Sequence, residues 1–143
     1  MKKDKRLFLL TLFMLCCFFM LWMTIFKRDP RMNRKIVFDL FWAFREWIAG
    51  SKNGKTESLQ YLKNVLFFVP FGVLFPWKEK GWKVLLFSAT AFSVLIEVIQ
   101  YVFLLGWCEL DDVISNALGA FIGFGLWILL SRLIGENHKW KEF

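Results

Sequence analysis

Two stretches in the second half of the chain carry polar side chains that are unusual in apolar sequence. In IEVIQYVFLLG, Glu97 and Gln100 are three residues apart, so they share one face of a helix. In CELDDVISNALGAFIG, one face of the following helix carries, at spacings of four, three and four residues, Asp112, Asn116, Gly119 and Gly123. A carboxylate in hydrocarbon is costly unless it is protonated, hydrogen-bonded, paired or hydrated. The pattern predicts a buried polar site. The simpler interpretation is that these groups hold helices together while Asp111 and Asp112 cap the second helix.

The acidic turn between these stretches would suit a hard cation. Glu109, Asp111 and Asp112 offer the oxygen ligands that Mg²⁺ prefers, and Glu97 would then act as a base. The alternative function is therefore an intramembrane metal-dependent enzyme that acts on a lipid or polyprenyl phosphate. Three neighbouring acids are a weak metal signal, however, and His138 is the single histidine of the chain. We expect a protein that is not an enzyme and has no cofactor. Proton transport through Glu97 is a third interpretation, which the small number of spans disfavours.

The composition places these residues in a membrane protein. Hydrophobic residues make up 57% of the 143 residues, too many for a soluble domain of this size. Stretches near the roughly 20 residues that cross a bilayer predict four transmembrane helices. Their ranges are about 7–26, 61–77, 82–105 and 112–131. The first exceeds the usual core of a signal peptide, so we expect it to be retained.

The segment IVFDLFWAFREWI, residues 36–48, is too short and too charged to span a membrane. Its aromatic residues suit the headgroup level, which predicts a short amphipathic helix at the interface. The simpler interpretation is that this helix only anchors the chain at the membrane. In the alternative, Arg45 and Glu46 contribute to a lid over the polar site. Together these elements predict an all-α membrane protein, a bundle of four transmembrane helices plus an interfacial helix, in a single domain of residues 1–143. The net charge of +7 favours anionic membrane lipids as partners and does not require nucleic acid.

Four spans would place both termini on one side of the membrane. We expect that side to be the cytoplasm because residues 106–112 contain no Lys or Arg, although the basic residues of 27–63 argue the other way. The same topology brings the polar residues to one membrane face. The predicted polar pocket consists of Arg45, Glu46, Asn64, Glu97, Gln100, Asp111, Asp112 and Asn116. The residues predicted to serve close helix packing are Pro70, Gly72, Gly119 and Gly123.

The order of these motifs is similar to that of a known family. FWAFREWIAG, NVLFFVPFGVLFP, IEVIQ and CELDDVISNALGAFIG together resemble the VanZ-like family of bacterial integral membrane proteins, over about residues 31–128. The resemblance places family motifs on Trp42, Arg45, Glu46, Asn64, Pro70, Gly72, Glu97, Gln100, Glu109, Asp111, Asp112, Asn116, Gly119 and Gly123. Two departures are Gly106-Trp107-Cys108, where many members have an Arg, and Ala117, where Thr is common. Without that Arg, either Arg45 neutralises the acidic cluster or the site binds a cation.

The resemblance implies a multi-pass protein in the bacterial cell membrane that acts at the cell envelope. The namesake of the family is associated with resistance to the glycopeptide teicoplanin. A polar pocket beneath an aromatic interfacial helix would suit a lipid-linked envelope component, or a lipophilic glycopeptide that meets the membrane there. We expect one of these as the partner.

Overall fold

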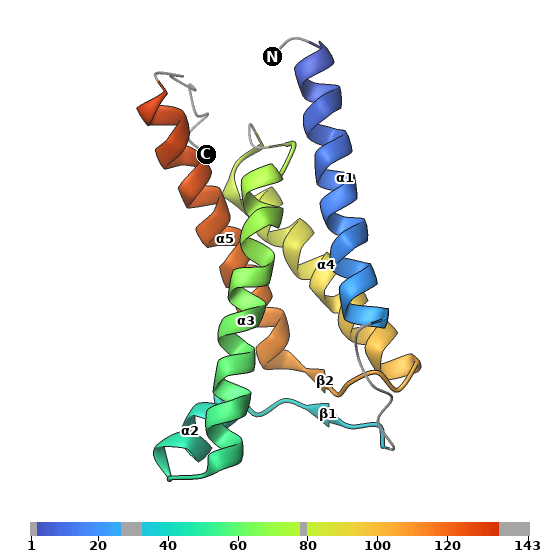
Figure 1. Ribbon diagram of the computed structural model, residues 1–143, viewed down its shortest axis with the longest axis vertical. Helices are drawn as coiled ribbons and strands as arrows, with labels where there is room; N and C mark the ends of the chain where they lie inside the picture. The colour runs from blue at the N-terminus through green and yellow to red at the C-terminus, as the bar shows by residue number, and fades with distance from the viewer. Residues whose placement is uncertain (1–2, 27–32, 78–79, 135–143) are drawn as a thin grey trace.

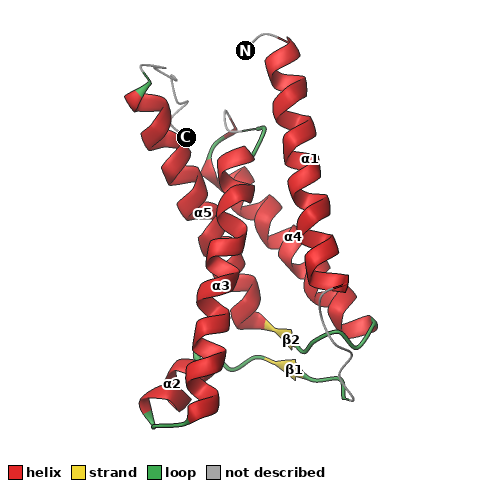
Figure 2. Ribbon diagram, viewed as in Figure 1, coloured by secondary structure: helices red, strands yellow, loops and turns green. Residues whose placement is uncertain are grey.

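The computed structural model of the chain describes residues 3–26, 33–77 and 80–134, and the chain is helical over most of them (Figures 1 and 2). His138 lies outside the described residues. In chain order the elements are α1 (Lys3–Phe26), β1 (Ile36–Val37), α2 (Trp42–Ile48), α3 (Lys52–Leu74), α4 (Trp82–Val102), β2 (Cys108–Glu109) and α5 (Leu110–Leu133).

Three of the described helices are long and apolar enough to cross a membrane. They are the segments Arg6–Phe26, Trp82–Val102 and Leu110–Leu133. Four were predicted. The remaining one, at about 61–77, corresponds to α3, which begins earlier, at Lys52. Its first half carries Lys55 and Lys63, and these charges reduce the apolar character of the helix.

The helices α3 and α5 approach each other closely at glycine residues. Gly119 and Gly123 on α5 and Gly72 on α3 all lie in the contact between the two helices. A Cβ atom at any of the three would overlap a backbone carbonyl oxygen of the facing helix. The oxygens belong to Val65, Val69 and Ala120 for Gly119, Gly123 and Gly72, respectively. Small residues permit this approach because no bulky side chain keeps the two backbones apart. Close packing of this kind stabilises helix pairs in lipid, where the hydrophobic effect contributes little. Pro70 is instead exposed on another side of α3.

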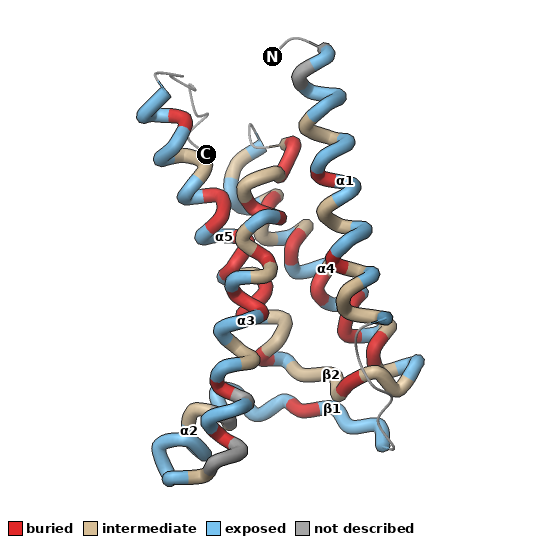
Figure 3. The backbone as a smooth tube through the Cα atoms, in the orientation of Figure 1, coloured by how far each residue is buried: buried red, intermediate tan, exposed pale blue. Residues whose placement is uncertain are grey.

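Aromatic side chains fill the space between α1, α3 and α4. Phe68 and Phe71 on one face of α3, and Phe75 at its C-cap, are almost completely buried. Phe13 of α1 packs edge-on against Phe71, with 4.9 Å between the ring centroids. Figure 3 shows that α1 is otherwise largely exposed, whereas buried residues follow the facing sides of α3, α4 and α5. The helices α3 to α5 therefore form the packed unit, and α1 lies on its edge.

The predicted interfacial helix over 36–48 is wrong for its first half. Ile36–Val37 form a short strand that pairs in parallel with Cys108–Glu109, and the helix covers only Trp42–Ile48. Two β-branched residues favour an extended backbone. The N–H of Cys108 also donates to the carbonyl oxygen of Lys35 at 3.0 Å, which extends the pairing. The fold is therefore helical with one small two-stranded sheet at the α2 end.

Candidate polar site at one end of the helix bundle

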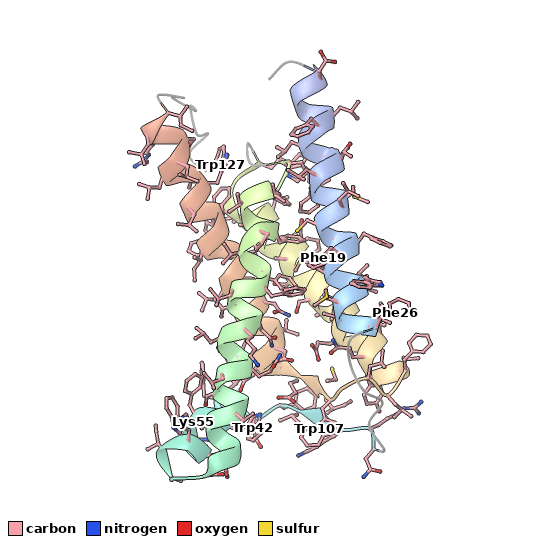
Figure 4. All side chains as sticks on the ribbon, viewed as in Figure 1. Phe19, Phe26, Trp42, Lys55, Trp107 and Trp127 are labelled. Atoms are coloured by element: carbon pink, nitrogen blue, oxygen red, sulfur yellow. The ribbon has the colours of Figure 1, made fainter. Side chains whose placement is uncertain are left out.

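Residues 33–41, which we call the strap, cross the end of the bundle beside the turn between α4 and α5 (Figure 1). Its two cations fix it there in addition to the strand pairing. Arg34 donates from Nη2 to the carbonyl oxygen of Val102 at 3.3 Å. Lys35 places its ammonium 4.8 Å from the ring centroid of Trp107, a cation–π contact. Trp42 and Trp107 lie at this same end of the molecule (Figure 4).

Asp111 connects the strap to the start of α5. Both of its carboxylate oxygens accept a hydrogen bond from the N–H of Phe41, at 2.8 and 3.1 Å. Asp111 is only 4% exposed. Phe41 has a φ of 54°, in the left-handed region that side-chain-bearing residues rarely adopt. The N-cap residue of α5 is Glu109, which makes no side-chain capping hydrogen bond, and Asp111 and Asp112 lie in the first turn of the helix.

Glu97 holds the strand that precedes α5. Its Oε2 atom accepts a hydrogen bond from the N–H of Glu109 at 3.1 Å, and its side chain is buried. Glu109 in turn accepts a hydrogen bond from Nε1 of Trp42 at 3.3 Å. These contacts join α4 and β2 to α2, which lies 67 residues earlier in the chain at the Trp42–Glu109 contact.

A second buried polar contact joins α4 to α5. The Nδ2 atom of Asn116 donates to Oγ of Ser93 at 2.8 Å. Ser93 was missed in the sequence, although it lies four residues before Glu97 and seven before Gln100 on the same helical face. Gln100 is fully buried, and neither its Nε2 nor its Oε1 has a hydrogen-bond partner among the described residues. A buried amide without hydrogen bonds lowers the free energy of unfolding by roughly 1–3 kcal/mol. Stability alone therefore does not favour glutamine at this position.

The site is negative in its local charge. Burial, followed by the nearby carboxylates of Glu97, Asp112 and Glu109, raises the pKa of the Cys108 thiol above its ordinary value. The acids do not gather around one point, however. In the part of the chain that the structure describes, no three Asp, Glu, His or Cys side chains are arranged to hold a metal ion. The set proposed for Mg²⁺, which was Glu109, Asp111 and Asp112, is thus not assembled.

The structure does not bring all of the predicted pocket residues together. Arg45 and Glu46 are exposed on α2, where they line a separate hollow of about 420 Å³ with Lys35, Val37, Asp39, Trp42 and Ala49. Asn64 is paired within α3, accepting from Nε2 of Gln60 at 3.1 Å. We therefore define the polar cluster as Ser93, Glu97, Gln100, Asp111 and Asn116.

Gly54 is a further residue that sequence reasoning missed. A Cβ atom there would overlap the backbone N of Trp47 and the backbone of Glu46, so it lets α2 fold back tightly onto α3. The Oγ atom of Ser51 accepts a hydrogen bond from the N–H of Gly54 at 3.4 Å and caps α3. The signal was present in the sequence: AGSKNG combines two glycines with Ser and Asn, residues typical of turns and helix starts.

Comparison with known proteins relates this architecture to one family. A family model described as VanZ/LLP1 matches residues 7–131. Protein VanZ of Enterococcus faecium is 31% identical over 80 residues, which are 54% of this chain and 50% of that protein. The chain therefore spans half the length of that relative. No solved structure matches.

Proposed function

Because the chain belongs to the VanZ/LLP1 family, we propose that it lowers the susceptibility of bacteria to glycopeptide antibiotics of the teicoplanin type. In this proposal it acts as a multi-pass protein of the cell membrane. Three helices that can cross a membrane and the similarity to Protein VanZ support a membrane protein of this kind. The action proposed is binding at the cell envelope, without chemical turnover.

The observation that carries the proposal is the polar cluster under the strap. Glu97 is 2% exposed and Gln100 is fully buried between helices that are otherwise apolar. Polar groups within membrane helices are expensive and more often belong to functional sites than to structural contacts. The strap lies beside the Asp111 end of the cluster, at the end of the bundle where a lipid headgroup would lie. We propose that displacement of the strap lets the cluster contact the polar headgroup of a lipid-linked envelope component.

Expression of the chain in a susceptible Gram-positive host should raise the minimum inhibitory concentration of teicoplanin several-fold. Glu97→Gln should abolish the increase. The amide keeps an oxygen that can accept from the Glu109 N–H but lacks the charge. Asp4→Asn, at an exposed position of α1, should retain it.

Immunoblots of isolated membranes would establish that the variants are present at equal levels. If the chain and an empty vector give the same inhibitory concentration, the proposed role is wrong. If Glu97→Gln protects as well as the unchanged chain, the role does not use the polar cluster.

We further propose that α3 is a fourth transmembrane helix, with α2 at the interface and both termini in the cytoplasm. The direction of the helices supports this arrangement. Both α1 and α4 run towards the end of the molecule that carries the strap, so the chain must return between them, and α3 makes that return (Figure 1). The start of α1 and the end of α5 lie at the opposite end. On α2, exposed Trp47 and Ile48 suit contact with lipid.

Cysteine labelling in intact cells should reveal this topology. We would replace Cys16, Cys17 and Cys108 with serine and introduce single cysteines by Asp4→Cys, Leu133→Cys or Lys55→Cys. A membrane-impermeant maleimide should label Lys55→Cys and spare the other two until the cells are permeabilised. Labelling of Asp4→Cys and Leu133→Cys on different sides would contradict four spans. Labelling of both from outside, with Lys55→Cys protected, would reverse the orientation.

A further inference from the structure

An apolar groove lies between α1 and α3, away from the polar cluster. Its volume is about 440 Å³, within the roughly 300–1,000 Å³ of ligand-binding pockets. Both helices contribute to its walls. The lining residues are Cys16, Phe19 and Met20 from α1, and Lys63, Leu66, Phe67 and Pro70 from α3.

The position of the groove relative to the membrane follows from α1, one of the helices able to cross it. Cys16, Phe19 and Met20 lie inside the membrane-spanning candidate Arg6–Phe26. Met20 is six residues before Phe26, or about 9 Å along the helix axis. At this depth the surrounding solvent is hydrocarbon, and the groove walls are apolar except for Lys63. A hydrocarbon chain therefore matches the groove, whereas water and polar solutes do not.

Lys63 is the one charged residue among those that line the groove. It is exposed and lies at the end of the groove nearer to α2. A lysine near the edge of the hydrocarbon layer packs its aliphatic stem along apolar surface and extends its ammonium towards the headgroups. Gln60 and Asn64, which are hydrogen-bonded to each other, lie on α3 close to Lys63 in sequence. The polar part of α3 therefore includes the position of Lys63. The ammonium is thus placed where a lipid phosphate lies.

We propose that this groove binds an anionic glycerophospholipid. One acyl chain packs against Phe19, Leu66 and Pro70, and the lipid phosphate pairs with the ammonium of Lys63. The site shares no residue with the polar cluster, so it does not depend on the proposed role in glycopeptide susceptibility. It depends on α1 lying in the membrane.

Native mass spectrometry of the detergent-purified chain tests the headgroup contact. We would titrate dioleoyl phosphatidylglycerol and, separately, dioleoyl phosphatidylethanolamine. The unchanged chain should prefer phosphatidylglycerol. Lys63→Ala should weaken phosphatidylglycerol binding about fivefold, the effect of one lysine near a charged lipid surface. It should leave phosphatidylethanolamine almost unchanged, and Lys63→Arg should retain the preference.

Lys55→Ala is the matched control for charge. Lys55 is exposed on the same helix, at its α2 end (Figure 4), and does not line the groove. This variant should bind phosphatidylglycerol as the unchanged chain does. Equal weakening by Lys55→Ala and Lys63→Ala would mean that overall charge, not the groove, attracts the lipid, and would overturn the proposal.

Cys16→Phe tests the apolar half of the site by placing a ring in the groove. It should reduce the binding of both lipids, with an unchanged unfolding temperature in detergent showing that the fold is retained. Full binding to this variant would overturn the proposal. So would a lipid-free dimer whose subunits crosslink through Cys16, because the groove would then be covered by a second copy of the chain.

Discussion

Alanine at Gly119 or Gly123 should destabilise the bundle by about 1–3 kcal/mol for each substitution, the usual effect of overpacking a well-packed contact. The added Cβ would overlap a backbone carbonyl oxygen of α3, and a backbone atom cannot move aside as the end of a flexible side chain can. The two helices would have to separate. The contact along α3 and α5 also positions α2, which is joined to the start of α3.

The free energy of unfolding, measured in mixed micelles with increasing SDS, would test this expectation. Gly125→Ala is the matched control, because it lies on the same helix and a Cβ atom there meets no other atom within 4 Å. It should leave the free energy unchanged or increase it by up to about 1 kcal/mol, since alanine is the better helix former. Equal effects at all three positions would show that α3 and α5 do not approach as closely as the structure places them.

The stripe formed by Asp112, Asn116, Gly119 and Gly123 shows what helical periodicity predicts and what it does not. The spacing indicated that these residues lie along one side of a helix. In the structure that side is divided between two neighbours, because Asn116 bonds to Ser93 of α4 while the glycines meet α3. Periodicity determines which residues are near each other on one helix. It does not determine which helix they face, since that depends on the packing of the whole bundle.

The strap is the part of the site that local patterns could not reveal. Its aromatic composition indicated a membrane interface. Two β-branched residues alone do not predict a strand, because the pairing partner of Ile36 is Cys108, far along the chain. Phe41 adopts a left-handed conformation that its residue type disfavours. Its N–H is held by the Asp111 carboxylate, a contact between residues 70 positions apart. The sequence could therefore identify Glu97 and Asp111 as candidate site residues. It could not predict that their hydrogen-bond donors are the backbone N–H groups of Glu109 and Phe41.

Asp111→Ala should release the strap and the start of α2 without unfolding the helix bundle. The substitution removes both oxygens that accept from the Phe41 N–H, and a hydrogen bond to a charged group contributes about 1.5–3 kcal/mol. The left-handed backbone of Phe41, which costs about 1–3 kcal/mol, would then lose a contact that stabilises it. Asp111→Asn should have a smaller effect, because the amide retains one acceptor oxygen.

Hydrogen–deuterium exchange of peptides from residues 34–48 would measure the release. A loss of about 1.5–3 kcal/mol corresponds to exchange roughly 10–150 times faster in Asp111→Ala. Asp39→Asn, at an exposed acid on the strap itself, should exchange at the original rate. If Asp111→Ala instead accelerates exchange only in the first turn of α5, then Asp111 serves chiefly as a helix cap, as the simpler interpretation of the sequence held. Faster exchange across the strap would show that the buried Asp111 carboxylate holds the strap in place, as a binding site beneath a displaceable strap requires.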